Sequence, residues 1–481
     1  MISKNIIKEI ILSNRSFILE SVSMIVPRAA ASVVASGKTV IMHGIRRSGK
    51  TFILYDIFRR NRDAALYLDF EDDRLTGFTA ADFQTVQDAF LELRPEAASM
   101  GATAGRIVYL FDEIQHVEGW ERFCRRVTER ENAAVYVTGS SSRLMPLEVD
   151  TAIRGRAWSV AVFPFSFPEF LQLRLGKVDN KEILYGTGKV ETKRLFAEYA
   201  KWGGFPETAL ASNPQDKTKL LKEYLRAMFF RDLVERYGMT NIALFDALAD
   251  KLFSSFSTRL SLMAFYRQYK DLFPLSKDLL FQYFHNFEES MLIFAVRKFS
   301  ESSYKRSRNP VKIYPADTGL CRRVASEDAG RILENIVFIE LARRGGEVYY
   351  FEEKKECDFV VKDGEAAAEA VAVAEAGAVA GKVVAAVWSA AEAAAEAGAG
   401  LAAKDGDAKG AGFAAFQVCM ELTDENRRRE TDGLLAACRR LNVNEGTILT
   451  DDQEWDEEAE GIKISVRPVW RWLRENRGSG L

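Results

Sequence analysis

Short runs of apolar residues, each followed by a polar or glycine-rich turn, dominate the first third of the chain. Three of them span residues 39–43, 106–111 and 133–138, with amphipathic or polar stretches between them. Continuous apolar runs of this length are typical of strands buried on both faces, as in a parallel sheet covered by helices. We therefore expect an α/β fold with a parallel-sheet core in this part of the chain.

A glycine-rich motif follows the first apolar run and precedes a helical pattern at residues 52–58. It matches G-x-x-x-x-G-K-[ST] in full and reads Gly44, Ile45, Arg46, Arg47, Ser48, Gly49, Lys50 and Thr51. Strand, glycine loop and helix in this order form a P-loop, whose backbone amides and helix N-terminus bind phosphate. In such loops the lysine contacts the β- and γ-phosphates and the hydroxyl ligates Mg²⁺. We therefore predict a triphosphate site with Lys50 in catalysis and Thr51 as a metal ligand.

Two acids, Asp112 and Glu113, end the second apolar run. By itself such a pair is typical of a solvated strand end. Beside a P-loop it matches a Walker B motif, in which one acid holds Mg²⁺ and the next polarises the attacking water. We therefore predict Asp112 as a metal ligand and Glu113 as the catalytic base.

The third apolar run ends in Thr138-Gly-Ser140-Ser141. If its strand lies between the other two, its polar tip can reach the γ-phosphate. We predict Ser140 as the residue that senses this phosphate, with Thr138 and Ser141 as alternatives, although these residues are also ordinary turn formers. Further along, Arg156 is either a residue that completes the site of a neighbouring subunit or a surface arginine.

Six segments in order resemble a family of bacterial and archaeal AAA-type ATPases: GIRRSGKT, YLDFEDDRL, VYLFDEIQHVEGWE, VYVTGSSSRL, RGRA…FPFSFPEFL and WGGFPE. The resemblance covers residues 21–364 and resumes near 416. It implies ATP as the nucleotide, since no guanine-reading N-K-x-D element is present. It also implies a helical lid, to which the WGGFP turn belongs, and a C-terminal domain of poorly known function.

Residues 241–325 combine short helical patterns with two strands. A helix begins after Ser276, and strands are expected at 291–296 and 312–314, an order that predicts a winged helix. The stretch 297–312 carries six basic residues against one acid and suits contact with DNA phosphates, although basic residues also crowd solvated hairpin tips. The candidate DNA-binding residues are Lys305, Arg306, Arg308 and Lys312.

The C-terminal part resembles the restriction-endonuclease-like α/β fold, with Glu334 on a helix and Asp358 on a strand. The next strand should carry an acid and a lysine, but Gln417 and Cys419 stand at those positions. Glutamine is a weaker metal ligand than a carboxylate, and cysteine cannot replace the charge of lysine. We therefore interpret Glu334, Asp358 and Gln417 as a degenerate nuclease site.

Residues 365–415 interrupt this domain with 24 alanines in 51 residues, and we assign no function to them. The expected domains are a P-loop core at 1–160, a helical lid at 161–240, a winged helix at 241–325 and the nuclease-like domain at 326–481.

Composition excludes several classes of protein. The 481 residues carry a net charge of −3, which excludes a uniformly basic nucleic-acid coat. Five dispersed cysteines and three histidines argue against a disulfide scaffold or a structural zinc site. Because no signal peptide or membrane span is recognisable, we expect a cytoplasmic protein.

These observations lead to one expected function and two alternatives. We expect Mg²⁺-dependent ATP hydrolysis by a ring-forming ATPase that binds or remodels DNA, including branched DNA. The first alternative is a nucleotide-controlled switch that docks a protein partner, which DNA would not stimulate. The second is an active Mg²⁺ nuclease built on Glu334 and Asp358.

Overall fold

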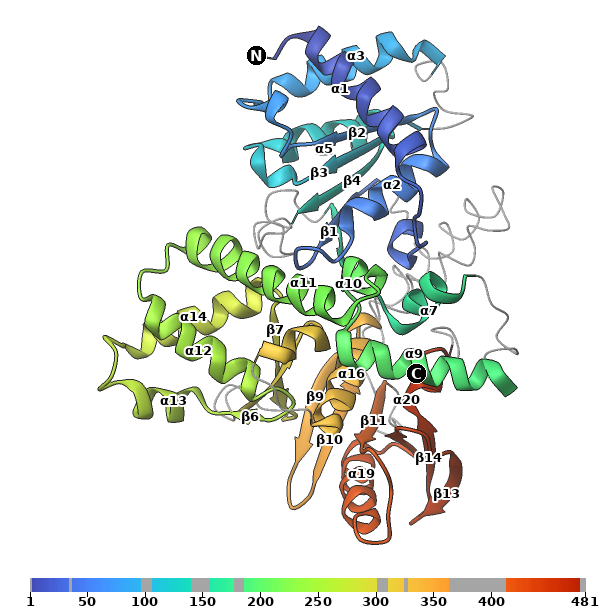
Figure 1. Ribbon diagram of the computed structural model, residues 1–481, viewed down its shortest axis with the longest axis vertical. Helices are drawn as coiled ribbons and strands as arrows, with labels where there is room; N and C mark the ends of the chain where they lie inside the picture. The colour runs from blue at the N-terminus through green and yellow to red at the C-terminus, as the bar shows by residue number, and fades with distance from the viewer. Residues whose placement is uncertain are drawn as a thin grey trace, which may run out of the picture. The chain divides into compact units, whose positions relative to one another are not determined.

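The computed structural model describes residues 2–33, 37–96, 106–139, 156–176, 186–300, 310–323, 328–362 and 412–475. The chain forms two compact units (Figure 1): the first comprises Met1–Ala295 and Pro310–Ile339, and the second comprises Val296–Asn309 and Glu340–Leu481. Among the described residues, no helix is both long and apolar enough to cross a membrane.

The five strands at the start of the first unit form a parallel sheet in the order β2-β3-β4-β1-β5. They are β1 (Thr39–His43), β2 (Ala65–Asp69), β3 (Val108–Asp112), β4 (Ala134–Gly139) and β5 (Ala157–Ala161). The expected parallel-sheet core is confirmed. β4 lies between β1 and β3, which is the position its polar tip needs to reach the γ-phosphate, and the carboxyl ends of these three strands meet at one edge.

Helices cover both faces of this sheet (Figure 1). They include α1 (Lys4–Ser16), α2 (Lys50–Arg60), α3 (Asp82–Leu93) and α5 (Trp120–Arg130). Successive strand residues alternate between two cores: Ile41 packs with Phe111 in one, whereas Met42 packs with Leu110 in the other. Because both faces of the inner strands β1, β3 and β4 are buried, apolar residues occupy most of their positions, which explains the continuous runs in the sequence.

A group of helices follows the sheet. It consists of α7 (Phe167–Leu175), α9 (Gly186–Trp202), α10 (Pro206–Leu210), α11 (Pro214–Ala227) and η6 (Met228–Glu235), a π-helical segment. Gly203 and Gly204 turn the chain between α9 and α10, and the Gly204 amide donates to Asp317 Oδ2 at 2.7 Å. A Cβ on Gly203, whose φ is +76°, would lie 1.7 Å from Asp317 Oδ1, so this turn requires glycine.

The first unit continues with short helices and strands. In order they are α12 (Ile242–Ser254), β6 (Arg259–Leu260), α13 (Leu262–Tyr269), α14 (Lys277–Glu289), β7 (Ile293–Lys298), which leads into the second unit, and β8 (Val311–Pro315). The Ser276 hydroxyl accepts from the Leu279 amide at 3.0 Å, as expected for the N-cap of α14. β6 pairs antiparallel with β8.

The second unit contains a mixed sheet. Its elements are the end of α16 (Ala329–Arg343), then β9 (Glu347–Glu352), β10 (Glu356–Lys362), β11 (Phe413–Val418), α19 (Arg427–Leu441), β12 (Glu445–Thr450), β13 (Trp455–Ala459), β14 (Ile462–Pro468) and α20 (Val469–Trp472). β10 is antiparallel to β9 and β11, whereas β12 is parallel to β11 and β14. Helix α19 packs closely, because Gly433 leaves room for the Glu356 carbonyl.

One detail of this unit differs from expectation. β11 begins at Phe413, inside the alanine-rich stretch, because Ala414 and Ala415 pair with Val361 and Val360 of β10. The last strand, β14, ends at Pro468, and Trp470 lies in the short helix α20 that follows. Residues 363–411, which hold most of the alanine-rich segment, lie outside the described residues.

Candidate nucleotide-binding site

The glycine loop between β1 and α2 has backbone conformations that few residues tolerate. Gly49 is the N-cap of α2 with φ +94°, and Arg47 also has a positive φ of 65°. A Cβ on Gly44 would lie 2.1 Å from the Val162 carbonyl oxygen. The loop therefore passes directly against the backbone that follows β5 and directs the N-terminus of α2 toward the carboxyl edge of the sheet.

Lys50 is the first residue of α2, and its side chain is buried. Its Nζ donates to the carbonyl oxygens of Gly44 at 2.9 Å and Ile45 at 3.1 Å. Burial lowers the pKa of the ammonium, and the charges of Glu113, Asp112 and Asp232 oppose that shift. Lys50 Nζ thus lies inside the loop, where a bound phosphate would also lie.

Asp112, at the end of β3, is 2% exposed and is held by hydroxyl groups from three other elements. Tyr67 of β2 donates to Oδ2 at 3.0 Å, Thr138 of β4 donates to Oδ1, and the Thr51 hydroxyl of α2 is a further partner. Burial raises the pKa of Asp112, and these hydrogen bonds oppose the shift. The Thr51 hydroxyl and the Asp112 carboxylate, both hard oxygen ligands in direct contact, fit the predicted Mg²⁺ site.

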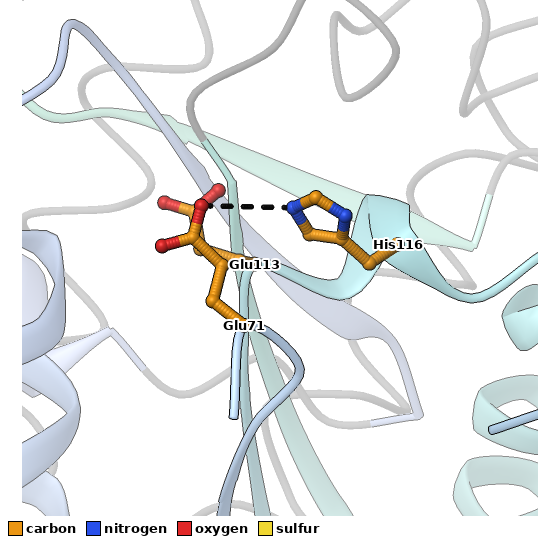
Figure 2. Close-up of side chains that lie close together, drawn as sticks. All are labelled: Glu71, Glu113 and His116. Carbon is orange, nitrogen blue, oxygen red and sulfur yellow. Dashed lines mark ion pairs between the residues drawn. The ribbon is translucent and has the colours of Figure 1, made fainter. Parts of the chain in front are cut away.

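Glu113 follows directly and has a positive φ of 50°, which turns the chain sharply after β3. Its carboxylate accepts a hydrogen bond from Gln115 Nε2. The Glu71, Glu113 and His116 side chains converge, with ligand-type atoms within 4.8 Å of one another (Figure 2). His116 Nε2 lies 3.7 Å from Glu71 Oε1, so Glu71 and His116 lie beside Glu113, the predicted base.

The two arginines of the glycine loop pair with acids of the following helices. Arg46 Nε donates to Asp232 Oδ1 of η6 at 2.8 Å, and Arg46 Nη1 lies 3.9 Å from Glu71 Oε1. Arg47 Nη1 lies 3.6 Å from Glu207 Oε2 of α10. The helical segment 206–235 is therefore tied to the phosphate loop through charged contacts.

Arg28, which precedes β1 in the chain, also contacts the loop. Its guanidinium donates to the Ser48 carbonyl at 2.7 Å and to the Phe163 carbonyl at 2.8 Å. It also pairs with Glu169 of α7 at 3.1 Å, and it is 7% exposed. Sequence reasoning missed Arg28, because its partners lie 20 to 141 positions away and no local motif surrounds it.

Sequence reasoning also missed Tyr67, Glu71, His116 and Asp232. A signal was present for the first three, because they lie near the carboxyl ends of β2 and β3, where parallel strands of this fold present their functional groups. Asp232 had no such signal, since it lies in a helix 186 positions from Arg46.

The remaining site predictions for the first unit concern the end of β4 and Arg156. Ser140 and Ser141 lie outside the described residues, whereas Thr138, the alternative to Ser140, contacts Asp112. Arg156 accepts at its carbonyl oxygen from the Thr39 amide, so it lies at the amino end of β1, opposite the P-loop. Its guanidinium pairs with Glu129 of α5.

The basic residues predicted to contact DNA are only partly described. Lys305, Arg306 and Arg308 lie outside the described residues. Lys312 is 3% exposed, and its Nζ donates to Glu334 Oε1 at 3.0 Å. Lys312 is therefore buried and paired with an acid, and its side chain is not on a surface that could contact DNA phosphates. This observation corrects the prediction that Lys312 is a DNA-binding residue.

Glu334 lies in the first unit, where Tyr314 also donates to Oε1 at 2.6 Å. Asp358 and Gln417 belong to the second unit and contact each other, with the Asp358 amide donating to Gln417 Oε1 at 3.2 Å. Asp358 Oδ2 accepts from the Val418 amide at 3.0 Å. The residues of the predicted degenerate nuclease site are thus divided between the two units.

Gln417 has a further partner that sequence reasoning missed. Its Nε2 donates at 2.7 Å to Glu430, an acid of α19 that is 4% exposed. Burial, with the charges of Glu430 and Asp358, raises the pKa of the nearby Cys419 thiol to about 12. Cys419 is therefore a neutral thiol at neutral pH and supplies no positive charge.

Comparison with known proteins identifies similar domains. Residues 36–171 match the model of an AAA domain, and residues 193–330 match a domain of unknown function. An uncharacterized protein of Methanocaldococcus jannaschii is 29% identical over 488 aligned residues, which cover 98% of this chain and 96% of that protein. An uncharacterized protein of Haemophilus influenzae is 28% identical over 312 residues, 62% of this chain and 71% of that protein.

Solved structures are more distantly similar. A Walker-type ATPase of Pyrococcus abyssi aligns with a TM-score of 0.39 at 14% identity, over 59% of this chain and 89% of that chain. The RuvB Holliday junction branch migration motor of Thermotoga maritima aligns with a TM-score of 0.24 at 12% identity, over 64% and 91%. These TM-scores are too low to support conclusions about this chain. The AAA-domain match and the P-loop geometry within the same residues support an AAA-type ATPase core in this protein.

Proposed function

We propose that this chain binds ATP together with Mg²⁺ at the P-loop and hydrolyses it. The observation that carries the proposal is the meeting of Lys50, Thr51, Asp112 and Thr138 at the carboxyl edge of β1, β3 and β4. These side chains supply a phosphate-binding cation, two metal-ligand oxygens and a hydroxyl that orients one of them.

Each residue has a separate task in this mechanism. The loop amides and the N-terminus of α2 bind the phosphates, and Lys50 exchanges its two carbonyl partners for phosphate oxygens. Thr51 and Asp112 hold Mg²⁺, which when bound offsets the charge that develops on the transferred phosphoryl group. Glu113 takes the proton of the attacking water, and the Thr138 and Tyr67 hydroxyls keep the Asp112 carboxylate in position.

Phosphate release tests this proposal. The wild-type chain should hydrolyse ATP with Mg²⁺ and lose that activity with excess EDTA. Lys50→Ala should lose both nucleotide binding and turnover, because Lys50 Nζ is the cation held against the Gly44 and Ile45 carbonyls of the loop. Lys219→Ala, on a cation of α11 whose side chain is 77% exposed, is the control and should leave both unchanged. Hydrolysis by Lys50→Ala at the wild-type rate would refute the assignment.

We also propose that hydrolysis is coupled to DNA. The support is the element order α12, β6, α13, α14, β7, β8, which is that of a winged helix, together with the basic residues Lys305, Arg306 and Arg308 between β7 and β8. The test is fluorescence anisotropy with duplex, single-stranded and branched DNA at several salt concentrations. Affinity that falls steeply with salt, and that weakens when all three residues are changed to alanine, supports the proposal. DNA that neither binds nor stimulates hydrolysis would favour a switch that docks a protein partner.

The second unit is proposed to be nuclease-like in outline and inactive. Gln417 and the neutral Cys419 thiol stand where an acid and a lysine are needed, and Asp358 already accepts a backbone hydrogen bond. Supercoiled plasmid with Mg²⁺ or Mn²⁺ should therefore remain intact. Nicking by the wild type, but not by Asp358→Ala, would contradict this proposal.

A further inference from the structure

The lid segment η6 places a carboxylate at the phosphate loop. Asp232 is 8% exposed and accepts from Arg46 Nε at 2.8 Å. The charged groups that act on it are Arg46, Lys50 and Arg236. A nearly buried anion thus lies among three cations, two of which, Arg46 and Lys50, belong to the motif that binds phosphate.

The other cations of the loop are also engaged by the protein itself. Lys50 Nζ donates to two loop carbonyls, and Arg47 lies near Glu207 of α10. A phosphate that enters the loop brings several negative charges to the same donors. It must therefore compete with these internal partners, of which Asp232 is the buried anion with the shortest contact to the loop.

We propose that Asp232 is an internal competitor of the nucleotide phosphate: phosphate binding displaces its carboxylate from Arg46 and releases η6 from the P-loop. The inference rests on the proposed nucleotide site and adds a regulatory role for the lid. Arg46 also lies 3.9 Å from Glu71, which lines the predicted base Glu113. Arg46 thus lies between η6 and the residues beside Glu113. Displacement of Asp232 therefore changes the partners of this arginine.

The competition predicts that removal of the Asp232 charge tightens nucleotide binding. At the effective dielectric of a protein interior near the surface, removal of one negative charge beside the phosphates should raise the affinity for nucleotide on the order of tenfold. The effect should be larger for ATP than for ADP, because ATP carries more charge. A residue that merely supported the fold would show no such dependence on the charge of the ligand.

Titration of a fluorescent ATP analogue and of its ADP counterpart tests the proposal on the full chain. Asp232→Asn should bind both more tightly, whereas Asp232→Glu, which keeps the charge, should resemble the wild type. Asp271→Asn, on an exposed aspartate in the turn before α14, is the matched control and should bind as the wild type does. Weaker or unchanged binding by Asp232→Asn would overturn the inference.

Amide hydrogen exchange of the wild type provides a readout that needs no variant. Nucleotide should increase exchange in residues 228–235 while it protects residues 44–51. Protection of both segments would mean that Asp232 stays paired, and would overturn the inference even if Asp232→Asn fails to fold. A wild type that binds no nucleotide would instead refute the proposed function, so the two failures are distinguishable.

Discussion

At the scale of single residues, the site depends on where charges are buried. Asp112 is enclosed by the hydroxyls of Tyr67, Thr51 and Thr138, whereas Glu113, the next residue, turns away from the strand with a positive φ. Two adjacent acids thus have different surroundings. The enclosed one is suited to a fixed ligand role, and the other is suited to exchange protons with water.

Replacement of Glu113, the proposed base, should separate binding from turnover. Glu113→Gln keeps the shape of the side chain and removes its ability to accept a proton, so we expect ATP binding near the wild-type level. Hydrolysis should fall by a factor of about 10² to 10⁴. Equilibrium binding and phosphate release measured on the same sample check this. A normal rate would place the base elsewhere.

Thr138 should act through Asp112. Thr138→Val removes the hydroxyl that donates to Asp112 Oδ1, which leaves a buried carboxylate with one fewer partner. We expect slower hydrolysis and a higher Mg²⁺ concentration at half-maximal rate, while Thr138→Ser restores both. A magnesium titration at saturating ATP is the measurement. An unchanged magnesium requirement would argue against this positioning role.

His43, the last residue of β1, should make stability depend on pH. Burial, reinforced by the Lys50 charge, lowers the pKa of its imidazole to about 4. The folded state therefore favours neutral histidine, and stability is lost as the pH falls from the unfolded value near 6.5 toward 4. The expected loss is about 3 kcal/mol.

Urea unfolding at several pH values, compared between the wild type and His43→Gln, isolates this contribution. The control is His285→Gln, on an exposed histidine of α14. Parallel pH profiles of the wild type and His43→Gln would contradict the prediction.

At the scale of elements, the P-loop is shaped by segments that surround it. The backbone after β5 passes against Gly44, α7 is tied through Glu169 to Arg28, and η6 contacts Arg46. The loop conformation therefore depends on the packing of the helices after the sheet as well as on its own glycines.

Loss of the Arg28 contacts should destabilise the first unit. Arg28→Ala removes a hydrogen-bond donor from the Ser48 and Phe163 carbonyls and separates Glu169 from its buried partner. Removal of one member of such a buried pair costs about 3–5 kcal/mol. Arg60→Ala, which breaks the more exposed pair with Asp56, should cost less than about 1 kcal/mol. Equal losses of unfolding free energy in Arg28→Ala and Arg60→Ala would show that the Arg28 contacts contribute no more than an exposed ion pair.

At the scale of the whole molecule, the chain forms two units with separate cores. All residues of the candidate nucleotide site belong to the first unit, whereas Asp358, Gln417 and Glu430 belong to the second. Damage confined to the second unit should therefore leave nucleotide binding intact.

Gly433→Val provides this test. A Cβ at this position of α19 would lie 1.9 Å from the Glu356 carbonyl oxygen, so the helix must move away from β10. We expect an earlier unfolding transition for the second unit and unchanged ATP affinity. Arg428→Ala, on a side chain of the same helix that is 92% exposed, should change neither. A loss of ATP affinity in Gly433→Val would mean that the units depend on each other.

The sequence by itself determined the features whose chemistry is local. The P-loop is eight consecutive residues, the Walker B pair is adjacent, and apolar runs without alternation require a sheet covered on both faces. The sequence also placed the N-cap of α14 at Ser276. These inferences depend on near neighbours in the chain, which the sequence displays directly.

Only the tertiary structure decided which distant residues complete the site and which charges are accessible. Lys312 ends a basic stretch that predicts contact with DNA, yet its side chain is buried and paired with Glu334. Glu430 lies among charged residues of α19, yet it is buried against Gln417. Arg28 and Asp232 reach the P-loop from outside every motif. The physical reason is that burial and charge pairing arise from long-range packing, for which a single sequence carries no local signal.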